Sequence, residues 1–369
     1  MQISDGIFVL SFFAWIIQNK WRIIIDKKDY YFIGFVGCVF IINGVYYLLH
    51  QQRGFLMSSA YYLYNLMVIL VVRDFKSNRT FLKALLIASC INLLVQLFIL
   101  FLDKGAYATA RVRFMGTFND PNQFSFSMFT NLLLTYLLAC YMKDQENSNR
   151  KTIVFFAFIL AFYFIYQGSS TGMLLGILTF MVTMIALFLY SNNTPLVVTL
   201  RLIMIILAVF IVFFILFSSG FSIEPTEYEK DNFLALRLRW KIDEFKAEGL
   251  SALTDNRGIN KVFNNPRNIF FGAGEGYFDR YPESPYEVHS TFISLLFSYG
   301  ILPFLILIKW IWDNVKNTNK ALIPVYIALL IESFTLAHQR QPVFWMLILL
   351  GSLEFHSREV PQHKLEVKL

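Results

Sequence analysis

Residues 80–102 read TFLKALLIASCINLLVQLFILFL, an apolar run in which Lys83 is the one charged residue. A helix of this length crosses the hydrocarbon core of a bilayer, which is about 30 Å thick. Comparable runs recur along the chain, which is 56% hydrophobic and only 15% charged, whereas about a quarter of the residues of soluble proteins are charged. Because the runs are continuous rather than alternating, we predict helices that span a membrane.

The sequence predicts an all-α polytopic membrane protein with about eleven transmembrane helices and one large extracytoplasmic loop that is partly helical. Residues 1–217 are expected to hold eight of the helices, 218–287 the loop, 288–355 the last three helices, and 356–369 a cytoplasmic tail. The expected spans are 3–18, 30–49, 54–72, 80–102, 121–142, 152–167, 171–190, 198–217, 288–312, 321–338 and 342–355.

Lys and Arg are divided unequally between the two sets of short loops. One set holds most of them, and the other holds only Arg53, Lys104, Arg111, Arg113 and Arg340. Cytoplasmic loops are enriched in Lys and Arg, so the N-terminus and the long loop are both expected outside the cytoplasm. This sorting accounts for the net charge of +7 without a nucleic-acid partner.

Within the long loop, residues 224–249 are expected to form a helix. Thr226 and Glu229 have the spacing of a capping box, and Gly249 is placed to end the helix. Residues 251–288 are rich in Asn, Gly and Pro, and we expect coil with turns there.

The first candidate anion site is the segment around Arg111 and Arg113. It leads into Asp120 and Pro121, the residue types of a helix start, and a helix N-terminus presents free N–H groups to an anion. The alternative is a capped membrane helix whose arginines only touch lipid headgroups.

The second candidate anion site is Arg237 in the long loop. It has no acidic residue one helical turn away, whereas Arg239 has Asp243 and is expected to pair with it. A planar guanidinium without a local partner suits phosphate oxygens. A solvated basic face is the alternative.

His289 opens the apolar run 288–312 and is a candidate general base, since a histidine that is neutral near pH 7 accepts a proton. A capping or interface role is the alternative.

Gly272 and Gly274 permit tight turns or close approach of the backbone to a ligand. The chain has no HExxH, Cys/His cluster or Walker loop, so neither a metal nor a cofactor is predicted. Glu332, inside an apolar run, is expected to pair with a basic residue nearby, His338 or Arg340.

Taken in order, these segments resemble the O-antigen polymerase and ligase superfamily of membrane glycosyltransferases. The likeness covers about residues 105–305, and it rests on RFMGTFNDPN (113–122), SSTG (169–172), Arg237 near Trp240, NPRNIFFGAG (265–274), HSTF (289–292) and YGI (299–301). Ser170 departs from the pattern, because family members commonly have an arginine there, so any role of that arginine is lost or moved.

The resemblance implies a glycosyltransferase of the bacterial cytoplasmic membrane that acts in the synthesis of a cell-envelope polysaccharide (O-antigen, capsule or exopolysaccharide). Of the two activities of the superfamily, we expect a repeat-unit polymerase. It would transfer a glycan from an undecaprenyl-diphosphate carrier to a sugar hydroxyl of another lipid-linked repeat, outside the cytoplasm and with inversion. Arg113 and Arg237 would bind the diphosphate, and His289 would take the acceptor proton. The remaining residues expected to bind substrate are Arg111, Asn122, Arg239, Gly272 and Gly274.

Expected partners are the lipid-linked oligosaccharide, membrane lipid, a flippase and a chain-length regulator. Two other functions stay open. A ligase would transfer the glycan to a lipid or protein anchor, and a transporter would move the lipid-linked oligosaccharide across the membrane.

Overall fold

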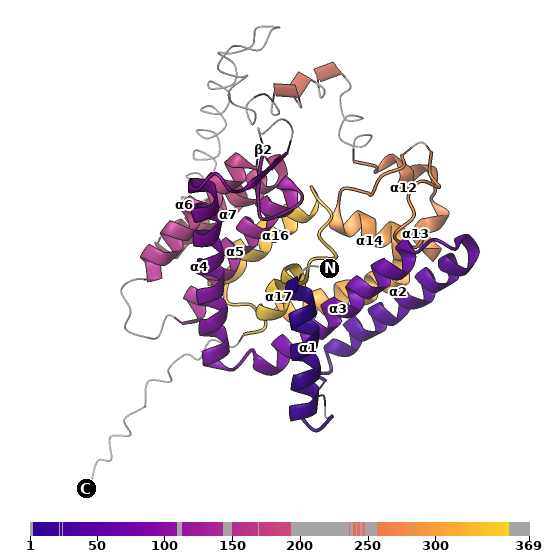
Figure 1. The fold of residues 1–369 in the computed structure, drawn as a ribbon, viewed down its shortest axis with the longest axis horizontal. Coiled ribbons are helices and arrows are strands. Elements are labelled where there is room, and N and C mark those ends of the chain that lie inside the picture. Colours follow the sequence, from indigo (N-terminus) through magenta and orange to yellow (C-terminus); the bar gives the residue numbers. More distant parts are fainter. Residues whose placement is uncertain are drawn as a thin grey trace.

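The computed structural model describes residues 3–21, 23, 25–108, 113–142, 150–168, 170–192, isolated positions between 236 and 247, 257–282 and 284–353. Its longer helices are α1 (Ile3–Gln18), α2 (Asp29–His50), α3 (Gly54–Phe75), α4 (Arg79–Phe101), α5 (Pro121–Tyr141), α6 (Arg150–Gln167), α7 (Thr171–Asn192) and α15 (Ile301–Val315) (Figure 1). The shorter ones are α12 (Asn260–Asn264), α13 (Arg267–Phe271), α14 (Thr291–Tyr299), α16 (Ile323–Ser333) and α17 (Pro342–Leu350), with a 3-10 turn, η1 (Lys320–Leu322). A two-stranded hairpin, β1 (Ala106–Ala108) and β2 (Arg113–Gly116), precedes α5.

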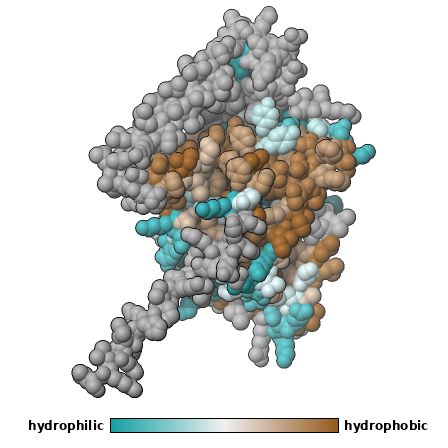
Figure 2. Space-filling view, turned by 90° about the vertical axis from the view of Figure 1, so that its left-hand side faces the viewer, coloured by the Kyte–Doolittle hydropathy of each residue, from teal (hydrophilic) through white to brown (hydrophobic). Residues whose placement is uncertain are grey.

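The described helices have the length and composition of a membrane protein. Five of them, α2, α3, α4, α5 and α7, are long and apolar enough to cross a bilayer, and α1 and α6 are shorter apolar helices. On the face in Figure 2, hydrophobic residues form a broad band with hydrophilic residues at its edges. The helical character is therefore confirmed, and five of the described helices have the length and apolar composition that spanning a membrane requires. The count of eleven spans stays a prediction, because 198–217 lies outside the described residues.

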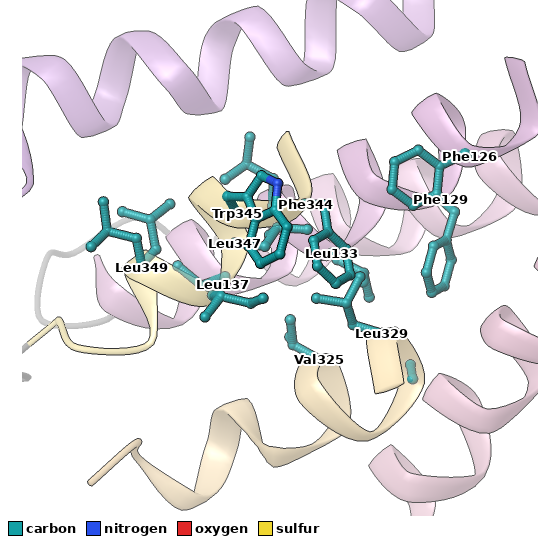
Figure 3. Close-up of a cluster of buried hydrophobic side chains, with 14 of the residues drawn as sticks. Phe126, Phe129, Leu133, Leu137, Val325, Leu329, Phe344, Trp345, Leu347 and Leu349 are labelled. Carbon is teal, nitrogen blue, oxygen red and sulfur yellow. The ribbon is translucent and has the colours of Figure 1, made fainter. Parts of the chain in front are cut away.

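Helix α5 forms the centre of the hydrophobic core. It is buried almost all round, unlike α4, which buries only a few of its residues. Figure 3 shows Leu133 and Leu137 of α5 facing Val325 and Leu329 of α16 and the aromatic rings of α17. Because α5 makes so many apolar contacts, its packing also positions the hairpin that precedes it.

The helices form two groups that meet along α17. Figure 1 shows α4, α5, α6, α7 and α16 together on one side, and α2, α3 and α14 on the other. Helix α17 packs against α3 and α15 of the second group and α5 of the first. We call the boundary between the two groups the seam.

The expected helix 288–312 is wrong, because the chain breaks there into α14 and α15. Gly300 at the break has φ +78°, a conformation that residues with a Cβ rarely adopt. The N–H groups of Ala273 and Gly274 bond the carbonyls of Phe297 and Ser298, 2.8–3.0 Å away. The last carbonyls of α14 are thus satisfied by a distant loop, so the helix can end inside an apolar run.

Two further differences from the sequence prediction concern length. Helix α16 covers only Ile323–Ser333 of the expected 321–338, and α17 only Pro342–Leu350 of 342–355. A third difference concerns residues 251–288, which were expected to form coil with turns. The structure has two five-residue helices there, α12 and α13. The expected helix 224–249 lies mostly outside the described residues, although those described within it, such as Leu236 and Trp240, are helical.

A buried ion pair joins helices where α2 begins and α3 ends. Arg73 donates to both carboxylate oxygens of Asp29, at 2.6 and 2.9 Å, and to the side-chain oxygen of Asn314 at 3.0 Å. Trp310 also donates to Asp29, at 3.2 Å. A charged side chain that is buried away from water is costly unless it is paired and hydrogen-bonded. The contacts of this cluster therefore hold α2, α3 and α15 together.

Candidate functional site

The hairpin and the start of α5 form one corner of the candidate site. The predicted helix start is confirmed: the Asp120 side chain accepts the N–H groups of Asn122 (2.8 Å) and Gln123 (3.0 Å), with Pro121 in the first turn. Arg113 of β2 donates to the side-chain oxygen of Asn122 and to the Gly168 carbonyl, each at 3.1 Å. Two predicted site residues, Arg113 and Asn122, are therefore in direct contact.

His289 lies just before α14. Its backbone N–H donates to the Arg257 carbonyl at 2.9 Å, and its ring stacks on Tyr286 with centroids 6.4 Å apart. Burial lowers the pKa of the imidazole, the charges of Arg257 and Lys261 lower it further, and the Asp120 carboxylate opposes them. A pKa below 6.5 leaves the ring neutral at pH 7, which is the form that accepts a proton.

The Asp120 carboxylate raises the pKa of His289, as a charge in the same region does. A chain of contacts across the seam supports this arrangement. The ring of Phe126, on α5, stacks on His338 at a centroid distance of 3.6 Å. The backbone N–H of His338 donates to the Thr291 hydroxyl at 2.9 Å. Thr291 is the first residue of α14 and lies two residues after His289. The loop that carries His338 therefore contacts the second turn of α5 and the first residue of α14.

Arg257 is a residue that the sequence prediction missed. Its guanidinium donates to the Phe334 carbonyl at 3.4 Å, and no carboxylate lies within ion-pair distance of it among the described residues. Burial alone lowers its pKa. Nothing local in the sequence marks it, because it reaches His289 and Phe334 only through the fold.

A cluster of acidic residues around Arg340 was also missed. Arg340 contacts Glu275 at 2.7 Å and Glu287 at 3.0 Å, and the Gln339 amide donates to both carboxylates at 3.0 Å. Tyr299 adds a 2.6 Å hydrogen bond to Glu275. The residue types were visible in the sequence, but their spacing of more than fifty positions gives no sign of pairing.

The two carboxylates of this cluster have opposite pKa shifts. Burial raises the pKa of Glu275, but Arg340 and the hydrogen bonds of Tyr299 and Gln339 outweigh it, so the net shift is downward. For Glu287, burial and the charge of Glu275 prevail over Arg340 and raise the pKa to about 7. One guanidinium between two carboxylates stabilises a single negative charge well, and the second carboxylate holds a proton more readily.

Glu332 is paired as the sequence predicts. One of its carboxylate oxygens lies 2.9 Å from the ring of His338, while Arg340, the other expected partner, is taken by Glu275 and Glu287. Arg239 likewise makes its expected pair with Asp243, at 3.8 Å.

Gly272 and Gly274 have positive φ, +79° and +67°, as tight turns require. Their close neighbours are parts of the chain: a Cβ on Gly272 would lie 2.7 Å from the Ser298 carbonyl, and one on Gly274 2.9 Å from the rings of Tyr46 and Phe55. The elements that closely approach this backbone are α14 and the aromatic rings of α2 and α3. A role in binding substrate stays a prediction.

The remaining predicted site residues are only partly placed. Arg111 and Arg237 lie outside the described residues. The described positions between 236 and 247, in salmon in Figure 1, lie at the same end of the molecule as β2 and α12. In the part of the chain that the structure describes, no group of three His, Cys, Asp or Glu could hold a metal ion.

Comparisons with protein-family models, with curated proteins and with solved structures find no match to this chain.

Proposed function

We propose that this protein is a membrane glycosyltransferase that uses a lipid-diphosphate-linked oligosaccharide as donor. In this proposal it acts as a repeat-unit polymerase on the extracytoplasmic side of the bacterial cytoplasmic membrane. The observation that carries the proposal is the position of His289: an imidazole with a lowered pKa, at the start of α14, in the same region as Asp120 and the Arg113–Asn122 pair.

The proposed reaction assigns each residue a task that its chemistry permits. His289 takes the proton of the acceptor hydroxyl as the oxygen attacks the anomeric carbon of the donor sugar. The bond from that carbon to the diphosphate breaks, and its electron pair leaves on the phosphate oxygen. Arg113 and Arg237 stabilise the charge that grows on the diphosphate. A single displacement of this kind inverts the anomeric carbon.

The test uses purified protein in detergent with a defined lipid-linked repeat as both donor and acceptor. Elongated products are expected for the wild type, and His289→Ala is expected to lose about a hundredfold or more of the rate, the usual size of a general-base contribution. His50→Ala is the matched control, since His50 stacks on Tyr46 at the end of α2.

Detergent has no two sides, so elongation under these conditions excludes a purely transporting protein. Activity toward a lipid anchor but not toward a second repeat would identify a ligase instead of a polymerase. Full activity in His289→Ala would contradict the assigned base.

A further inference from the structure

An apolar groove lies in the surface of the seam, between α14, α15 and α16. It has a volume of about 330 Å³ and is lined by Phe292 and Leu296 of α14, Phe304 and Ile308 of α15, and Leu330 and Phe334 at the end of α16. No polar atom of the described residues lines it. Leu330 and Phe334 are about half exposed, at 46% and 47%, so the groove opens outward.

One end of this groove meets the candidate site. Phe334 contributes its ring to the lining, 5.8 Å from that of Phe292, and its carbonyl to the hydrogen bond from Arg257. Phe292 lies three residues after His289, in the first turn of α14. The apolar walls therefore end where the Arg257 guanidinium, the His289 ring and the N-terminus of α14 begin.

The two ends of the groove fit the two parts of a lipid phosphate. A guanidinium and a helix N-terminus both favour an anion, and no described carboxylate neutralises Arg257. The apolar walls give a hydrocarbon chain the contacts that it otherwise makes with other lipids. A groove of about 330 Å³ with one cation at its end suits a single-tailed lipid better than a two-tailed phospholipid.

We propose that this groove binds the isoprene units nearest the diphosphate of a polyprenyl diphosphate, and that Arg257 binds the diphosphate. This inference rests on the proposed function for its choice of lipid, and it adds a binding residue and a path for the tail. The headgroup then lies beside His289, and the tail leaves between α14 and α16 toward the surrounding membrane.

The test is a binding measurement without any sugar. A polyprenyl diphosphate with a diazirine in one of its first isoprene units is irradiated with the purified full-length protein, and the labelled peptides are mapped by mass spectrometry. Label is expected on Phe292, Leu296, Phe304 and Ile308 and on the segment 330–334, and not on the exposed Leu302 and Leu305 between them. An excess of untagged polyprenyl diphosphate is expected to displace it, and phosphatidylglycerol is not.

Two pairs of matched substitutions distinguish a specific loss of binding from general damage to the fold. Arg257→Gln is expected to weaken labelling by about tenfold, the effect of losing one charge-assisted hydrogen bond. Arg267→Gln removes an exposed arginine of α13 and is expected to change nothing. Leu330→Trp fills the groove and is expected to reduce labelling. Leu302→Trp is not, because Leu302 of α15 is 66% exposed and lies outside the groove.

Three outcomes would overturn the inference. They are label spread evenly over exposed residues such as Leu302 and Leu305, equal displacement by phosphatidylglycerol, and equal effects of the two arginine substitutions. The result is also separable from the proposed function. Groove labelling in a protein that transfers no glycan would refute the function alone, and transfer by a protein labelled elsewhere would refute the groove alone.

Discussion

At the scale of single residues, His289 lies among charges that act on the pKa of its imidazole in opposite directions. Burial, Arg257 and Lys261 lower this pKa below 6.5, and Asp120 raises it. A general base works only in its deprotonated form. The proposed transfer rate should therefore rise with pH through this pKa and be level at neutral pH.

Two substitutions are expected to move this rise in opposite directions. Arg257→Gln removes a positive neighbour, so the pKa of His289 increases and the rise moves to higher pH. Asp120→Asn removes a negative neighbour and moves it to lower pH. Asparagine caps a helix as well as aspartate does, so α5 keeps its first turn. The measurement is kcat/KM for glycan transfer as a function of pH, and a profile that stays in place in both variants contradicts the role of His289.

Glu287 gives a second residue-scale prediction, on stability. Its pKa is raised from 4.5 to about 7 in the folded protein, so the folded state keeps a proton that the unfolded chain releases. The free energy of unfolding is therefore expected to fall by about 3 kcal/mol as the pH rises from 4.5 to above about 7. Glu287→Gln should abolish the fall, which thermal unfolding in detergent from about pH 4 to pH 8 can follow.

Glu275 provides the opposite control for this measurement. Its pKa is lowered, so its contribution to stability is present above 4.5 and lost only at lower pH. Glu275→Gln should destabilise the protein at pH 7, where Glu287→Gln does not. Equal behaviour of the two variants would mean that Arg340 does not distinguish the carboxylates.

At the scale of the elements, the break between α14 and α15 depends on Gly300. Its φ of +78° and ψ of 173° lie in a region open almost only to glycine, and a Cβ there would lie 2.5 Å from the Phe270 carbonyl. Gly300→Ala is expected to cost about 1–3 kcal/mol in the free energy of unfolding. Gly37→Ala is the control, because Gly37 lies within α2 with open space around it.

Unfolding of the two variants by denaturant in detergent checks this prediction. Because α14 carries Thr291 and adjoins His289, Gly300→Ala should also lower the proposed transfer rate, which Gly37→Ala should leave unchanged. Equal stability of both variants would show that the break tolerates a side chain.

The elements also show how far sequence reasoning reaches. Apolar runs predict α2 to α5 and α7 to within a few residues, and Asp120 predicts the start of α5, because these signals are local. The break at Gly300 was missed since the run 288–312 is apolar on both sides of it, and its cause is a hydrogen-bonding loop at 272–274. Arg257 and the Glu275–Arg340 cluster were missed for the same reason, as both depend on contacts made only by folding.

At the scale of the whole molecule, an apolar band separates two polar ends. The Arg73–Asp29 cluster holds the end where α2 begins, and the hairpin, α12 and the candidate site lie at the other (Figure 1). The proposed donor is used outside the cytoplasm, so its site has to face outward. The excess of Lys and Arg at the Arg73 end predicts, by the positive-inside rule, that this end faces the cytoplasm.

This orientation predicts which turns can be labelled from outside the cell. In a variant whose native cysteines are replaced, Gln51→Cys, in the α2–α3 turn near the site, should react with a membrane-impermeant maleimide on intact cells. Ser77→Cys, in the α3–α4 turn at the Arg73 end, should react only after the membrane is opened. Both positions are exposed, so access and not burial decides the result. The reverse pattern would put His289 in the cytoplasm, where a donor already moved across the membrane could not reach it.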